Sequence, residues 1–113
     1  QRLVHCIGKT KALELLMTAD IINASDSYHL GLVNHVVPSG LEVAKATEII
    51  EKIAEKAPFA IAKVIQAVNA CFEDGKNGFA EEVNFFGECC DTTDFREGAT
   101  AFIEKRKPNF TGQ

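Results

Sequence analysis

The chain has 113 residues, of which 46% are apolar and 25% are charged, a composition typical of one small globular domain. A net charge of -4 offers no basic field to a nucleic acid, and no apolar run approaches the roughly 18 residues of a membrane span. The start shows no signal-peptide layout, so we expect a cytoplasmic protein with no nucleic-acid or membrane partner. Because the chain begins at Gln1 rather than Met, we expect it to be a piece of a longer protein.

The first third of the chain predicts short elements. Residues 9–18 are rich in Ala and Leu and predict a helix, and Ile21–Ile22 predicts a brief extended piece. A short helix is expected from about Ser25 to Gly31, since glycine readily closes a helix. The β-branched residues of the segment Val33–Val37 predict a strand that stops at proline.

The rest of the chain predicts four helices. The first is expected to begin at Ser39, which has capping-box spacing to Glu42, and Pro58 is expected to end it and start the next. The last ends near Lys107–Pro108. Apolar side chains recur at helical spacing on the final three helices, as Ile61, Val64, Ile65, Val68 and Phe72, then Phe79, Val83, Phe86 and Cys90, then Phe95, Ala99, Phe102 and Ile103. These stripes need partners, either in each other or in a neighbour.

No recognised catalytic constellation is visible, and no metal site is predicted. The three histidines are scattered, and the adjacent Cys89–Cys90 lacks the spacer of zinc and redox pairs. The run Lys105–Lys107 has two interpretations. Cations at the end of a helix oppose its dipole, and three adjacent cations could also bind a phosphate. Chemistry alone favours the first. Phe85–Phe86 adds an aromatic pair on the preceding helix, where a ring could stack on a purine.

Several segments toward the two ends of the chain are recognisable, namely Gln1–Leu3, Ile7–Lys9, Ala12–Leu16, Thr18–Asp20, Ile22–Ala24, Leu30–Pro38, Phe95–Gly98, Ala101–Phe102 and Glu104–Phe110. These segments resemble the enoyl-CoA hydratase/isomerase (crotonase) superfamily, and the middle helices match it in pattern only. One departure is Cys89–Asp91, where many hydratases have an aromatic or small residue followed by Ser or Ala.

The resemblance implies a mostly α chain with one or two short strands, which is the C-terminal helical trimerisation region of a crotonase (ββα spiral) fold. Residues 1–38 would end the spiral core, and residues 39–113 would form the trimerisation and coenzyme A-binding region. The parent subunit would hydrate 2-trans-enoyl-CoA to 3-hydroxyacyl-CoA in fatty-acid metabolism, without metal or other cofactor, as a homotrimer or dimer of trimers.

In the family, two glutamates activate water and two backbone amides form an oxyanion hole. No glutamate of this chain can be assigned to these roles, so we expect no catalytic residue here and an inactive fragment. What the resemblance carries over is coenzyme A binding, with Phe86 at the adenine and Lys105 at a phosphate, typically in a neighbouring subunit's site. An enoyl-CoA isomerase or another superfamily member, and a non-catalytic helical interaction module, remain as alternatives.

Overall fold

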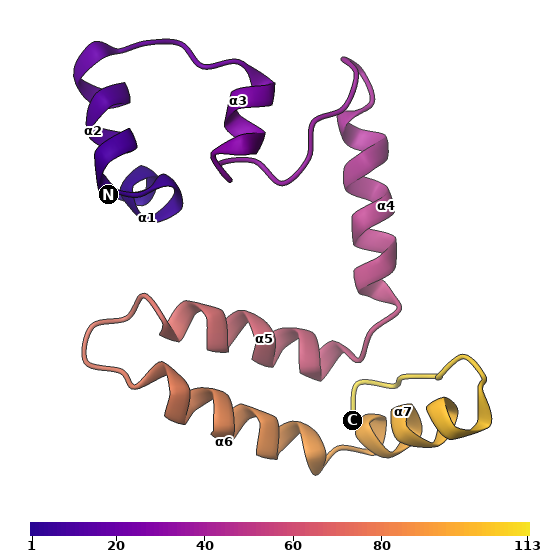
Figure 1. The fold of residues 1–113 in the computed structure, drawn as a ribbon. Coiled ribbons are helices and arrows are strands. Elements are labelled where there is room, and N and C mark those ends of the chain that lie inside the picture. Colours follow the sequence, from indigo (N-terminus) through magenta and orange to yellow (C-terminus); the bar gives the residue numbers. More distant parts are fainter. The chain divides into compact units, whose positions relative to one another are not determined.

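The computed structural model describes residues 1–113 and is built from helices joined by short loops (Figure 1). The helices are α1 (Arg2–Ile7), α2 (Lys9–Thr18), α3 (Ala24–His29), α4 (Glu42–Ala54), α5 (Pro58–Ala70), α6 (Gly78–Cys90) and α7 (Thr93–Glu104). The prediction of a mostly helical chain is therefore confirmed.

The predicted short strands are not present. Val33–Val37 forms irregular backbone, and so does Ile21–Ile22. A strand is stable only when another strand takes up its backbone hydrogen bonds, and none of the 113 residues forms one. The strand prediction was wrong for this chain because β-branched composition supplies a propensity but no pairing partner.

Contacts divide the chain into two compact units, Gln1–Lys45 and Ala46–Gln113, which are described separately. The predicted division of the domains after residue 38 stays a prediction. In the first unit Gly8 separates α1 from α2 with φ 80° and ψ 160°, a conformation that glycine adopts without a side-chain clash. The side chain of Asn23 caps α3, since its Oδ1 accepts the Asp26 amide at 2.8 Å.

Helix α4 begins later than the sequence predicts. The Glu42 carboxylate accepts the Gly40 amide at 2.9 and 3.1 Å, and backbone amides lower the pKa of Glu42. The helix therefore begins at Glu42, three residues after the predicted cap at Ser39. The bond from the Gly40 amide to an acidic side chain takes the place of the cap expected from the Ser39 side chain.

In the second unit α5 and α6 lie side by side and antiparallel (Figure 1). Pro58 occupies the first turn of α5 as predicted, because its missing N–H has no partner to lose there. Asn77 caps α6 by accepting the Ala80 amide at 3.3 Å. The helices approach each other at Gly78, where an added Cβ would make an ordinary contact of 3.7 Å with the Ala70 carbonyl oxygen.

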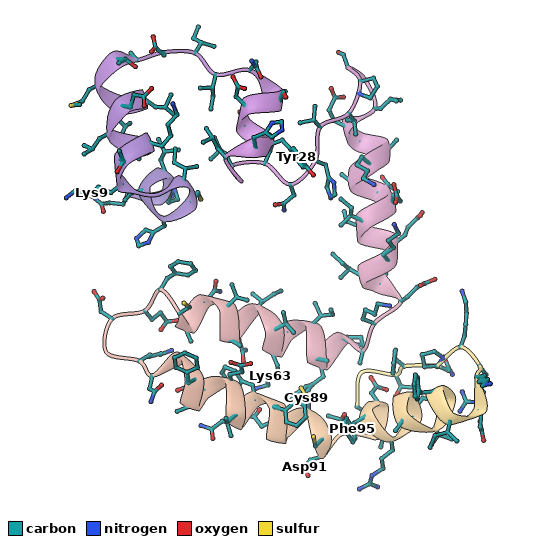
Figure 2. The ribbon with its side chains drawn as sticks, viewed as in Figure 1. Lys9, Tyr28, Lys63, Cys89, Asp91 and Phe95 are labelled. Carbon is teal, nitrogen blue, oxygen red and sulfur yellow. The ribbon has the colours of Figure 1, made fainter.

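A lysine, rather than the predicted apolar stripe, lies between α5 and α6 (Figure 2). The Lys63 ammonium stands 5.1 Å from the ring centroid of Phe59 and 4.9 Å from that of Phe85. It also pairs with Glu88 at 2.5 Å, and its side chain is only 16% exposed. The cation is thus held between two aromatic faces and a carboxylate, with its stem packed between the helices.

The apolar stripes of α5, α6 and α7 remain largely uncovered. Val64, Phe79 and Phe102 are 58%, 83% and 85% exposed, and Val83 is 71% exposed. The buried apolar residues of the chain are alanines only, Ala12, Ala70 and Ala101. Of the two predicted ways to cover the stripes, packing on each other is not what the second unit shows, because α5 and α6 meet through other side chains. The stripes' partners are not supplied by these helices.

Candidate functional site

The C-terminal end of α7 has a turn that is usually made by glycine. Lys105 follows the last helical residue with φ 55° and ψ 39°, in the left-handed region. The Arg106 amide donates to the Ala101 carbonyl at 3.0 Å, and the Lys105 amide donates to Phe102 at 3.3 Å. These are the bonds that close a helix through a left-handed residue. A side chain in this conformation costs roughly 1 kcal/mol, so the surrounding contacts must hold it.

Arg106 is fully engaged by two carboxylates. Its Nη1 and Nη2 donate to the two Glu97 oxygens at 2.6 and 2.8 Å, and its Nε donates to Glu104 at 2.6 Å. The hydrogen bonds from Arg106 lower the pKa of Glu97 to about 2, helped by the Asn109 amide. The same pairs raise the pKa of Arg106. A bidentate arginine pair of this geometry neutralises the guanidinium locally.

The two lysines of the run differ in their partners. Lys107 reaches Glu55 at 3.4 Å while its side chain stays 91% exposed. Lys105 makes neither an ion pair nor a side-chain hydrogen bond. Of the three adjacent cations, Lys105 is consequently the one whose side chain has no partner.

The aromatic candidate lies on a different helix. Phe86 is 67% exposed on α6, and no ring or cation contact joins it to Lys105. Lys105 follows the 12 residues of α7, which rise about 18 Å along the helix axis. Phe86 and Lys105 therefore come from different helices, and their side chains do not touch.

A second exposed ring, which the sequence interpretation missed, lies closer to Lys105. Phe102 is 85% exposed and precedes Lys105 by three residues, on the last turn of α7. Residues three apart on a helix are neighbours on its surface. The sequence places Phe102 in the apolar stripe of the last helix, and its spacing to the basic run could also have identified it as an exposed ring beside a cation.

A segment of the C-terminal tail folds back onto the start of α7. Asp94 is 2% exposed, and it accepts the amides of Thr111 and Gly112 at 2.7 and 2.8 Å. In return the Gln113 carbonyl accepts the Asp94 amide at 2.9 Å. Thr92 caps the same helix by accepting the Phe95 amide at 3.1 Å. The residues after Lys105 are thereby tied down at their far end.

Four hollows on the surface are each lined by a single carboxylate, the kind of group that acid–base catalysis uses. The first, of about 320 Å³, lies in the second unit near Cys89 and Phe95 and contains one carboxylate, that of Asp94 (Figure 2). The other three are likewise lined by one carboxylate each, those of Glu55, Glu82 and Asp26. None of the four combines the two glutamates that hydration of a double bond uses in the family.

Metal ligands, cysteines and the length of the helices also limit the class of site. No cluster of three or more His, Cys, Asp and Glu side chains has an arrangement suited to holding a metal ion. The four cysteines are free thiols, two of them exposed. None of the helices combines the length and apolar character that crossing a membrane requires.

Comparison with known proteins identifies the family. The "Enoyl-CoA hydratase/isomerase" family matches residues 1–113. The mitochondrial enoyl-CoA hydratase of Pongo abelii is 40% identical over 114 aligned residues, which cover 100% of this chain and 39% of that protein. The short-chain-enoyl-CoA hydratase of Clostridium acetobutylicum is 41% identical over 108 residues, with coverage of 95% and 41%.

Solved structures agree with this result. The crystal structure of an enoyl-CoA hydratase from Bacillus anthracis superposes with a TM-score of 0.92 at 38% identity, over 100% of this chain and 44% of that one. An enoyl-CoA hydratase structure from Geobacillus kaustophilus superposes with a TM-score of 0.90 at 30% identity. The chain thus belongs to the enoyl-CoA hydratase/isomerase family, and it spans about two-fifths of the length of the relatives it matches.

Proposed function

We propose that this chain is the assembly and coenzyme A-binding part of an enoyl-CoA hydratase subunit of fatty-acid metabolism. The parent enzyme adds water reversibly to a 2-trans-enoyl-CoA and forms a 3-hydroxyacyl-CoA. The observation that carries the proposal is the isolation of Lys105 as the unpaired cation of its run, in a chain about 40% identical to named enoyl-CoA hydratases. We also propose that the parent subunit is cytoplasmic, as the sequence suggested. One relative, by contrast, is named mitochondrial.

Coenzyme A carries groups that match the chemistry of Lys105 and of Phe86. Its adenosine 3′-phosphate and diphosphate are anions, and the Lys105 ammonium is a free donor for one of them. Its adenine can stack on an exposed phenyl ring, for which Phe86 is the residue implied by the family resemblance. Because Phe86 and Lys105 are not in contact, they act on separate parts of the ligand or on different ligands of the assembly.

The uncovered stripes of α5, α6 and α7 support a role in assembly. Phe79, Val83, Phe86 and Ile103 are 83%, 71%, 67% and 79% exposed. Burying one such side chain contributes roughly 1.5–3 kcal/mol, so leaving all of them in water is costly. We propose that copies of the subunit cover these stripes in a homotrimer or a dimer of trimers, except at Phe86, whose ring stays open to the adenine.

We further propose that the 113 residues have no hydratase activity by themselves and need no metal or other cofactor. The lack of paired glutamates in the four hollows supports this. An enoyl-CoA isomerase is the second candidate, because the matching family includes both activities. A non-catalytic helical module would also match the fold, but it would not require Lys105 to stay unpaired.

A hybrid enzyme tests the proposal. The 113 residues replace the stretch they match in the Bacillus anthracis enoyl-CoA hydratase, and hydration of crotonyl-CoA is measured. We expect Lys105→Gln to raise KM about three- to tenfold with kcat unchanged, because a contact made equally in ground and transition states affects KM alone. Phe86→Ala should raise KM in the same way.

The matched control is Lys9→Gln, which removes a lysine from the first unit that makes no ion pair. It should leave both constants unchanged. If the hybrid with Lys105→Gln has the same KM as the unsubstituted hybrid, the binding role of Lys105 is refuted. Hydration of crotonyl-CoA by the isolated 113 residues at an enzymatic rate would refute the division of labour between this chain and the rest of the subunit.

A further inference from the structure

The Glu97 carboxylate connects the middle of α7 to two points in the segment that follows the helix. Its oxygens accept the Arg106 guanidinium at 2.6 and 2.8 Å, and Oε1 also accepts the Asn109 amide at 2.7 Å. The Glu97 side chain is 25% exposed, so the pair is partly shielded from water. One side chain thereby fixes the chain direction directly after Lys105.

The backbone at Lys105 needs such support. A lysine in the left-handed conformation is strained by roughly 1 kcal/mol, and a helix usually places glycine there. The strain is held on the helix side by the bond from Arg106 to Ala101, and on the tail side by the Arg106 and Asn109 bonds to Glu97. Neither side involves the ammonium of Lys105.

The distribution of charge gives Glu97 a second effect. Arg106 would otherwise be a second cation directly beside Lys105, with a planar fork well suited to a phosphate. Glu97 and Glu104 occupy all three of its donor nitrogens. Arg106 is therefore withheld from a phosphate, while the Lys105 ammonium stays unpaired.

We propose that Glu97 is a positioning residue for the coenzyme A contact: by binding Arg106 and the Asn109 amide, it holds the backbone of Lys105 in the left-handed turn and keeps Arg106 from competing with Lys105 for the ligand's phosphate. This inference rests on the proposed function, because it assigns a role to Glu97 only if Lys105 contacts that phosphate. Glu97 itself touches no ligand atom.

The test compares six variants in the hybrid enzyme, namely Glu97→Gln, Arg106→Gln and the two combined, each without and with Lys105→Gln. Removing either partner releases the turn, so Glu97→Gln and Arg106→Gln should each raise KM for crotonyl-CoA about threefold with kcat unchanged. The combined variant should be no worse than either alone, because both act through one interaction. None should raise KM further once Lys105 is Gln.

A measurement on the 113-residue chain keeps the test valid if a hybrid variant fails to assemble. The Cα and Cβ chemical shifts of residue 105 report its left-handed backbone, and Glu97→Gln should move them toward averaged values. Arg106→Lys keeps the charge but cannot bind Glu97 through two nitrogens, so it should give an intermediate shift. Unchanged shifts at residue 105 in Glu97→Gln would overturn the inference.

The kinetic outcomes separate this inference from the function on which it rests. If Lys105→Gln leaves KM unchanged, the binding role of Lys105 fails and the positioning role fails with it. If Lys105→Gln raises KM but Glu97→Gln does not, the positioning role alone is overturned. A lower KM in Glu97→Gln would show that Arg106 is a phosphate ligand held back by Glu97, which also overturns it.

Discussion

Replacing Asp94 by Asn should detach the C-terminal tail from α7. In the native chain the carboxylate is 2% exposed and accepts the amides of Thr111 and Gly112 through separate oxygens, at 2.7 and 2.8 Å. An Asn side chain has nearly the same shape but only one acceptor oxygen. Its NH₂ group must therefore face one of the two backbone amides as donor against donor.

The expected loss follows from these contacts. A hydrogen bond to an ionised group contributes about 1.5–3 kcal/mol, and leaving a buried amide without an acceptor costs about 1–3 kcal/mol. Asp94 also lies in the first turn of α7, where losing a negative charge costs a few tenths of a kcal/mol more. Release of the tail lets water reach the unpaired amide and limits the total, so we expect a loss of about 2 kcal/mol.

Hydrogen exchange and urea unfolding measure this loss. In Asp94→Asn the amides of Thr111 and Gly112 should exchange about 30-fold faster, the factor that corresponds to about 2 kcal/mol. Asp91→Asn is the matched control, since it makes the same change at an exposed carboxylate that forms no ion pair or hydrogen bond. Exchange of the Thr111 and Gly112 amides at native rates in Asp94→Asn would refute the assignment of Asp94 as the tail's anchor.

Three further predictions concern the second unit. Lys63→Ala should lower the free energy of unfolding by about 1–2 kcal/mol in urea titrations, because the stem and both ring contacts are lost, while Lys63→Arg should retain most of it. The pKa of Glu97 lies at about 2 in the folded chain, below its ordinary value of 4.5, so its contribution to stability is present above about pH 4.5 and is lost as the pH falls toward 2. In Glu97→Gln the free energy of unfolding should not show this loss at acid pH. If its dependence on pH in this range equals that of the native chain, the pair of Glu97 with Arg106 is contradicted. Gly87→Ala should stabilise the chain by about 0.8 kcal/mol, since a Cβ there meets open space, whereas Gly98→Ala should gain less because its Cβ would stand 3.4 Å from the Phe110 ring. Equal thermal shifts for the two glycine variants would show that Phe110 does not pack on Gly98.

Local chemistry made much of the helical layout predictable. Residues 9–18 were predicted as a helix and form α2, and Pro58 begins α5 as predicted. Each of these features depends on neighbours within about four residues, through a backbone angle, a cap or a run of helix-forming side chains. The strand at Val33–Val37 failed because pairing depends on a partner distant in sequence.

The candidate site was predictable in part. The basic run Lys105–Lys107 and the aromatic pair Phe85–Phe86 could be read from the sequence. The family resemblance then selected Lys105 and Phe86 from them. The partners of the cations could not be read, because Glu97 lies nine residues before Arg106 and Glu55 lies 52 residues before Lys107. The exposure of Phe102 could not be read for a related reason, since its spacing suits a covered stripe as well as an exposed face.

The sequence by itself determined the family, the helical class and which helix faces are apolar, because motifs and periodicity are properties of neighbouring residues. Only the tertiary structure decided which faces are covered. It placed Lys63 rather than the apolar stripe between α5 and α6, and it left Lys105 as the unpaired cation of its run. Periodicity records that a face is apolar, but burial and ion pairing depend on which distant side chains fold against it.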